Sequence, residues 1–123
     1  MTHVRAAPRR QQRAARYRLS GTGAFEAVFR SGTRYDAHFL QLIAAPAARP
    51  PGRVGYVIGR KSIRNAVDRN RLRRRLRESV RAVRPAVEAF DVILRVRGPT
   101  ARNDIAAAVA ESRRLLARLV EQR

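Results

Sequence analysis

The sequence predicts an α+β fold, a two-layer sandwich in which a small central sheet packs against helices. Two stretches carry apolar residues spaced three and four apart, which is typical of amphipathic helices. Three shorter stretches are rich in apolar residues and are bounded by Gly or Pro, which is typical of strands. At 123 residues the chain has room for one modest core. We therefore expect one domain over residues 17–123.

The expected elements follow the order helix, strand, strand, helix, strand, helix. The first helix lies within residues 19–32, where Thr22 is a candidate N-cap and Gly32 a candidate terminator. The last helix spans residues 104–121, in which apolar residues recur every three or four positions.

The strands are expected at residues 34–45, 53–59 and 89–97, with room for one more short strand within residues 30–35. Alternation places Phe39, Gln41 and Ile43 on one face of the first strand, and Leu40 and Leu42 on the other. Gly55 and Gly59 share one face of the second strand, and Gly on a strand can mark the close approach of another backbone or a ligand.

The stretch from Arg60 to Arg84 is predicted to be helical because neither Gly nor Pro interrupts it. It contains ten Arg, one Lys and only two acids. Its apolar residues fall within one stripe, which we expect to be buried: Leu72, Leu76, Val80 and Val83. The remaining faces are crowded with guanidinium groups.

This arginine surface has two interpretations. A solvated helix face is the usual one for a charge run, but such a face mixes acids with bases. Eleven bases against two acids repel one another unless a polyanion neutralises them, and the whole chain carries a net charge of +19. We therefore favour nucleic acid as the partner.

Asn65 and Arg69 project onto the apolar side of the predicted helix, where a polar group is costly to bury. In one interpretation the first turns extend beyond the sheet and stay hydrated. In the other, both residues face a groove through which RNA passes. The sequence does not choose between them.

The triplet Arg69-Asn70-Arg71 follows a strand that ends at the basic pair Arg60-Lys61, and a run of arginines comes after it. This combination resembles the protein component of bacterial ribonuclease P, and the resemblance extends from about Arg18 to Leu119. It implies a left-handed crossover from the strand through the basic helix to the next strand. It also implies an RNA-binding set: Arg60, Lys61, Arg64, Asn65, Arg69, Asn70, Arg71, Arg73, Arg74, Arg75 and Arg77.

Phe25 and Phe29, four residues apart on the first helix, would ordinarily be interpreted as core residues. The resemblance implies instead that they line a cleft for the single-stranded 5′ leader of precursor tRNA, together with Gln41, Leu42 and the basic pair Arg60-Lys61. Aromatic rings stack on unpaired bases of any sequence. Many family members carry a third aromatic residue at the position aligned with Leu42, so the stacking platform is expected to be smaller here.

Residues 1–16 are basic and lack aromatic residues, which predicts a disordered arm that adds electrostatic affinity for RNA. The chain has no Cys and only two His, and its acids are scattered, so we expect neither a metal site nor a catalytic site on the polypeptide. No stretch is long and apolar enough to span a membrane, and no signal peptide is recognisable, so a cytoplasmic location is expected.

By resemblance, the partners are a catalytic RNA that acts with Mg²⁺ and the leader of precursor tRNA, while no DNA or membrane is expected. The protein would neutralise RNA charge and hold the leader, and alone it would be inactive. A small basic ribosomal protein is the main alternative, and a ribonuclease that acts without RNA is a further one. The spacing between the basic pair and the triplet favours the ribonuclease P subunit.

Overall fold

The computed structural model describes residues 16–122, which form three α-helices and one four-stranded sheet. The helices are α2 (Thr22–Ser31), α3 (Ala66–Arg81) and α4 (Ile105–Glu121). The strands are β1 (Thr33–Asp36), β2 (Leu40–Pro46), β3 (Val54–Val57) and β4 (Phe90–Val96). Short 3₁₀ turns at Ala86–Ala89 and Arg102–Asp104 lead into β4 and α4. The predicted arm, residues 1–16, lies outside the described residues except for Arg16.

The sheet has the strand order β1-β2-β4-β3. β2 pairs antiparallel with both β1 and β4, whereas β3 lies parallel to β4 at the other edge. α3 is therefore the crossover between two neighbouring parallel strands, as the sequence predicted. The left-handedness of this crossover stays a prediction.

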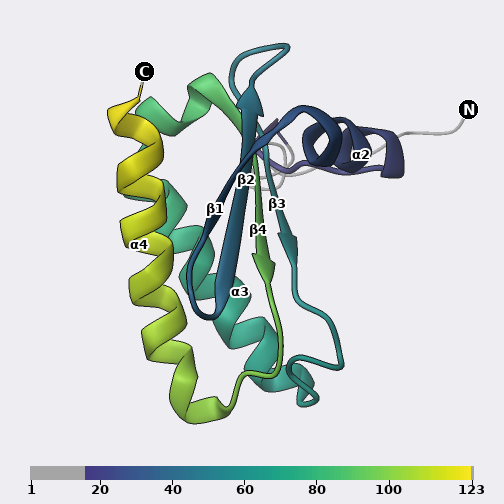
Figure 1. Cartoon of the computed structure of the whole chain (residues 1–123), viewed down its shortest axis with the longest axis vertical. Helices are drawn as coiled ribbons and strands as arrows, with labels where there is room; N and C mark the ends of the chain where they lie inside the picture. Colours follow the sequence, from purple (N-terminus) through teal and green to yellow (C-terminus); the bar gives the residue numbers. More distant parts are fainter. Residues whose placement is uncertain (1–15, 123) are drawn as a thin grey trace, which may run out of the picture.

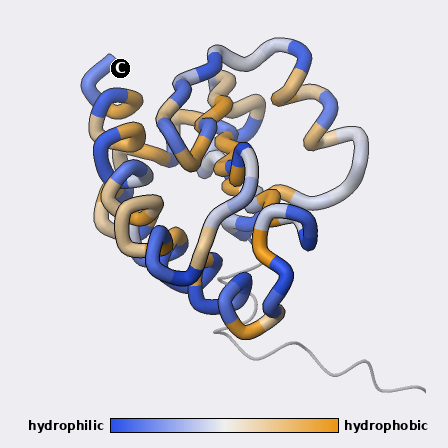
Figure 2. The backbone as a smooth tube through the Cα atoms, turned by 60° about the horizontal axis from the view of Figure 1, so that its bottom comes forward, coloured by the Kyte–Doolittle hydropathy of each residue, from blue (hydrophilic) through white to orange (hydrophobic). Residues whose placement is uncertain are grey.

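Helices cover the two sheet faces unequally (Figure 1). α3 and α4 lie side by side on one face and enclose the larger core cluster, which includes Leu40, Leu42, Leu94 and Leu116. α2 packs on the other face over a smaller cluster that contains Ile43 and Ile93. Hydrophobic segments gather at the centre, where the strands lie (Figure 2). The α+β sandwich is confirmed, with α2 as a partial third layer.

The basic helix begins six residues later than predicted, at Ala66. The Asn65 side chain accepts hydrogen bonds from the backbone N–H groups of Val67 and Asp68, at 2.8 and 3.3 Å. An Asn that satisfies these free N–H groups is a strong helix start. Residues 60–65 consequently form a loop that carries the first basic residues outside the helix.

The predicted strand at residues 34–45 is a hairpin made of β1 and β2, so a single strand was wrong and the additional short strand was right. The turn is closed by a hydrogen bond from Ala37 N to Leu40 O, at 2.8 Å. Glu111 on α4 holds the turn, because one of its carboxylate oxygens accepts from Phe39 N at 2.8 Å and from Leu40 N at 3.1 Å. Phe39 precedes β2 and packs against the larger core, so it does not share a face with Gln41 and Ile43.

The first helix begins at Thr22, the residue predicted to cap it, so its N-cap lies one residue earlier than predicted. Gly21, with φ of 88°, occupies the N-cap, and Thr22 is the first helical residue. Gly32 ends the helix as predicted, but its backbone is extended. It is needed for space, because a Cβ there would lie 2.7 Å from Ile43 Cγ2.

Candidate RNA interface

The outer face of α3 is a surface of exposed arginines. Arg71, Arg74 and Arg77 are exposed, whereas Arg73 and Arg75 are half-buried. Within residues 16–122 the one ion pair joins Arg102 to Asp68, so none of these five guanidinium groups has a described acid partner. Unpaired guanidinium groups spaced along one helix match the phosphates of a nucleic acid.

The inner face of α3 fixes how this surface is presented. Leu72 and Leu76 are fully buried against the sheet and α4. Ser112 on α4 donates a buried hydrogen bond to Ser79 on α3, with 3.0 Å between the two oxygens. Leu72, Leu76 and Val80 of the predicted stripe are therefore buried on α3, whereas Val83 is half-buried and lies beyond the helix, which ends at Arg81 and not at Arg84. The outer arginines project from a rigid support.

Asn70 lies on the exposed side of α3, beside the arginines. Its side-chain oxygen accepts from Arg73 Nη1 at 3.1 Å. This bond orients the Asn70 amide and leaves its N–H groups available to acceptors on a ligand.

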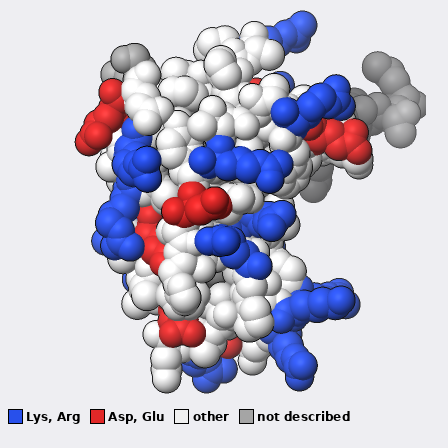
Figure 3. All heavy atoms as spheres, viewed as in Figure 1, with Lys and Arg blue, Asp and Glu red and all other residues white. Residues whose placement is uncertain are grey.

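Further cations lie on the loop between β3 and α3. Arg60, Lys61 and Arg64 are all exposed. In Figure 3 the basic side chains at the lower right, near the end of β3, stand apart from acids, whereas bases and acids mix over α4. The basic surface thus continues from the loop onto α3.

Asn65 and Arg69, whose role the sequence left open, both organise the start of α3. Besides the cap made by Asn65, Arg69 Nη1 donates to Ile63 O and to Arg64 O, at 2.8 Å each. Arg69 is half-buried, while Asn65 is exposed and keeps its amide N–H groups free of the cap. Neither interpretation from the sequence included this structural role.

Asp68 adds a second anchor to the same end of the helix. It is 7% exposed, and both of its carboxylate oxygens accept from Arg102 Nε at 3.2 Å. The pair ties the first turn of α3 to the turn that precedes α4. An acid in the first turn also favours the helix dipole.

On the opposite sheet face, α2 carries Phe25 and Phe29, which lie next to the part of that face that α2 leaves uncovered. Both rings are half-buried and pack on Ile43 and Ile93. The Phe25 ring lies against Gly55, where a Cβ would come within 2.7 Å of Phe25 Cε1. Something does approach Gly55 closely, but it is this side-chain ring and not the backbone or ligand expected from the sequence, and a Cβ at Gly59 would meet nothing within 4 Å.

A row of residues crosses the sheet next to the two rings, on the same face. The strand pairings place Asp36 beside Gln41, Gln41 beside Arg95, and Arg95 beside Val57. Gln41 is nearly buried, and its Nε2 donates to Asp36 Oδ1 at 2.8 Å. Arg95 was not among the site residues predicted from the sequence. As the one cation within the apolar strand β4, it could have been noticed there.

Leu42 does not belong to this surface, and its placement in the leader cleft is wrong. It is completely buried in the core under α3 and α4, on the far side of the sheet from Phe25. Ile43 occupies the position next to the rings instead. Successive residues of a strand point to opposite faces, so an error of one residue exchanged them.

Tyr56 lies between the sheet and the end of α3. Burial raises the pKa of its phenol to about 12, and the nearby Arg77 and Arg84 oppose this rise in part. Arg84 also lies 3.6 Å above the ring centre of Tyr17, in a cation–π contact. Tyr56 is therefore a neutral group at neutral pH.

Residues 16–122 contain no group of three or more His, Cys, Asp or Glu side chains arranged to hold a metal ion. No helix among them has the length and apolar character needed to cross a membrane.

Comparisons with known proteins identify the family. Residues 14–120 match the family model described as Ribonuclease P. The ribonuclease P protein component of Roseiflexus sp. is 42% identical over 84 residues, which are 68% of each chain. That of Acidothermus cellulolyticus is 36% identical over 110 residues, covering 87% of this chain and 91% of the other.

Solved structures agree on the fold. The Staphylococcus aureus RNase P protein at 2.0 Å superposes with a TM-score of 0.68 and 20% identity, covering 81% of this chain and 94% of that one. The Thermotoga maritima RNase P protein gives a TM-score of 0.67 and 22% identity, covering 86% and 96%. With a family match over most of its length, this chain belongs to the ribonuclease P protein component family, the protein part of a bacterial ribonuclease.

Proposed function

We propose that the chain is the RNA-binding subunit of a ribonuclease P ribonucleoprotein that removes the 5′ leader from precursor tRNA. In this proposal a partner RNA performs the hydrolysis with Mg²⁺, and the polypeptide supplies no catalytic group. Its location is the cytoplasm. Family membership favours this function over that of a small ribosomal protein.

The observation that carries the proposal is the presence of two different surfaces on opposite faces of one sheet. The outer face of α3 offers exposed cations, which suit the phosphates of a folded RNA. The surface beside α2 offers two aromatic rings, which suit unpaired bases. We assign the first surface to the partner RNA and the second to the leader.

The leader surface consists of two parts. Phe25 and Phe29 provide ring faces, with the row of Gln41, Arg95 and Val57 alongside. The exposed loop residues Arg60 and Lys61 come shortly after Val57, the last residue of β3, and supply charge for the leader phosphates. Stacking gives affinity with little dependence on base identity, which suits leaders of varied sequence.

A reconstituted cleavage assay tests the proposal. The full chain alone should leave precursor tRNA intact, and addition of the partner RNA at low Mg²⁺ should give cleavage at the leader junction. Cleavage by nuclease-free protein without RNA would contradict the assignment of catalysis. Co-purification of ribosomal RNA, in place of one structured RNA, would favour the ribosomal alternative.

Substitutions test the two surfaces separately. Phe25→Leu and Phe29→Leu retain apolar volume but remove the ring face, so each should weaken leader binding by about 1–3 kcal/mol. Precursor with a leader should then lose affinity, and tRNA without a leader should not. Arg71→Glu and Arg74→Glu should weaken assembly with the partner RNA instead. If the Phe variants lower the melting temperature and bind both tRNA forms equally well, the rings are only core residues.

A further inference from the structure

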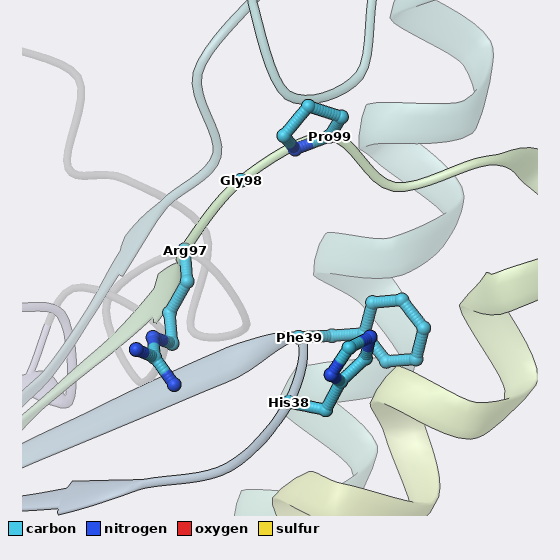
Figure 4. Close-up of a pocket in the computed structure, with 5 residues that line it drawn as sticks. All are labelled: His38, Phe39, Arg97, Gly98 and Pro99. Carbon is cyan, nitrogen blue, oxygen red and sulfur yellow. The ribbon is translucent and has the colours of Figure 1, made fainter.

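A hollow of about 390 Å³ lies at the turn between β1 and β2, outside both surfaces assigned above. His38 and Phe39 contribute to it from the hairpin turn, and Arg97, Gly98 and Pro99 contribute from the segment after β4 (Figure 4). Two segments that are distant in the sequence thus form one concave surface. Its volume falls within the usual range for small-ligand sites.

One wall of the hollow is aromatic. The rings of His38 and Phe39 meet edge to face, with centroids 4.5 Å apart and an angle of 85° between the planes. Phe39 packs against the larger core, while His38 is exposed. The buried ring therefore supports the exposed one, whose surface remains available to a ligand.

The hollow is also held rigidly. Arg97 N donates to Phe39 O at 2.9 Å, and Arg97 Nη1 donates to Ala37 O at 2.6 Å. On the other side of the turn, the buried Glu111 carboxylate accepts from the N–H groups of Phe39 and Leu40. A surface fixed before binding loses little conformational entropy when a ligand arrives.

The charge of the hollow is favourable for an anion. Arg97 lines the same hollow and is exposed, although its side chain and the two rings extend in different directions in Figure 4, and no acid lines the space. Glu111 is the acid bound to the turn, and it is 5% exposed. The combination of a ring surface and an accessible guanidinium is the chemistry that recognises a nucleotide.

The segment after β4 that lines the hollow is joined by a hydrogen bond to the loop that carries Arg60 and Lys61. Thr100, just beyond Pro99, donates from its backbone N–H to Ser62 O at 2.9 Å. RNA bound along the loop and α3 would therefore need only a short extension to reach His38.

We propose that this hollow binds one unpaired nucleotide of RNA, with the base against His38 and Phe39 and the phosphate beside Arg97. The proposal rests on the RNA-binding function proposed above, and it adds a stacking site separate from Phe25 and Phe29. The nucleotide can come from the partner RNA or from the leader, since both present the same chemistry.

Fluorescence anisotropy with the full chain and a short labelled oligoadenylate tests the site. His38→Ala should weaken binding by about fivefold or more, the lower end of what one stacked base contributes. His38→Phe should retain wild-type affinity because it keeps a ring. Arg97→Gln should weaken binding more than Arg49→Gln, the matched loss of an exposed arginine at the opposite end of the sheet. Melting temperatures report the fold of each variant.

Two further measurements identify the source of the nucleotide. Weaker assembly of His38→Ala with the partner RNA, measured without tRNA, assigns the site to that RNA. The assembled holoenzyme with His38→Ala is also tested with precursors that carry a long or a short leader. If it loses affinity for the long-leader precursor more than for the short-leader one, the site belongs to the leader. If His38→Ala equals wild type and Arg97→Gln equals Arg49→Gln in all three assays, the proposal is overturned. Failure of the wild-type holoenzyme to cleave precursor would instead overturn the proposed function.

Discussion

Replacement of Arg69 by Met separates a structural arginine from Arg71, which we propose contacts RNA. In the family motif Arg69 and Arg71 are two residues apart, and both were predicted to bind RNA. In the structure Arg69 is half-buried and holds Ile63 O and Arg64 O through Nη1, at 2.8 Å each, whereas Arg71 is exposed. Arg71→Met removes the same charge and the same donors two positions away, so it is the matched control.

The expected destabilisation follows from the two hydrogen bonds. A hydrogen bond from a charged donor contributes about 1.5–3 kcal/mol when it is buried. Arg64 is exposed, so water can reach the region of the freed carbonyls and replace part of this contribution. We therefore expect Arg69→Met to lower the free energy of unfolding by about 1–3 kcal/mol, and Arg71→Met to change it by less than about 0.5 kcal/mol.

Thermal unfolding and salt-dependent RNA binding together distinguish the roles. For a domain of this size, a loss of 1 kcal/mol lowers the melting temperature by roughly 4–8 °C. Arg71→Met should reduce the slope of log K against log salt by about 0.7–0.9, which corresponds to one lost phosphate contact. Equal melting temperatures, together with equal losses of slope, would show that Arg69 is an ordinary phosphate contact and would refute this reasoning.

Three other substitutions probe neighbouring features. Asn65→Ala should cost about 1 kcal/mol of stability by chemical denaturation, since it removes the cap of α3, while Asn65→Asp should stay close to wild type. Gly55→Ala should displace the Phe25 ring, lowering the melting temperature and the preference for precursor over leaderless tRNA; an unchanged preference would separate Phe25 from the leader. Tyr56 has its pKa raised from the ordinary 10.0 to about 12, so its contribution to stability is complete below pH 10 and is lost as the pH rises towards 12. The free energy of unfolding should decline by up to about 3 kcal/mol between pH 9 and 12, and Tyr56→Phe should reduce this decline.

The spacing of apolar residues in α3 predicted its buried face correctly, because the same residues pack against the sheet and α4. Leu72 and Leu76 are buried as their spacing predicted. The start of the helix was misjudged, although Asn65 followed three residues later by Asp68 is a recognised start signal. The start was placed at Arg60 only because no Gly or Pro interrupts residues 60–65. A capping residue such as Asn65 also sets the start of a helix, and this signal was not used.

The hairpin at the end of β1 had no comparable signal. Its turn contains Ala37, His38 and Phe39, without Gly, Pro or Asn. The turn is stabilised from a distance, by Glu111 on α4, and no local window of sequence contains that contact. The placement of Leu42 in the cleft had a different cause. Alternation had already put Leu42 on the face opposite Gln41 and Ile43, and only the family resemblance placed it beside Gln41.

The loop before α3 explains why structural and RNA-binding residues are interleaved in one motif. Its backbone is held by Arg69 at Ile63 and Arg64 and by Thr100 at Ser62, and the Ile63 side chain is buried. The exposed cations on this loop are therefore carried by a fixed backbone. A chain with a net charge of +19 has abundant attraction for any polyanion, so attraction alone cannot select one RNA. Selection of one RNA requires cations at fixed separations. The half-buried Arg69 and the buried Ile63 fix those separations by holding the loop backbone.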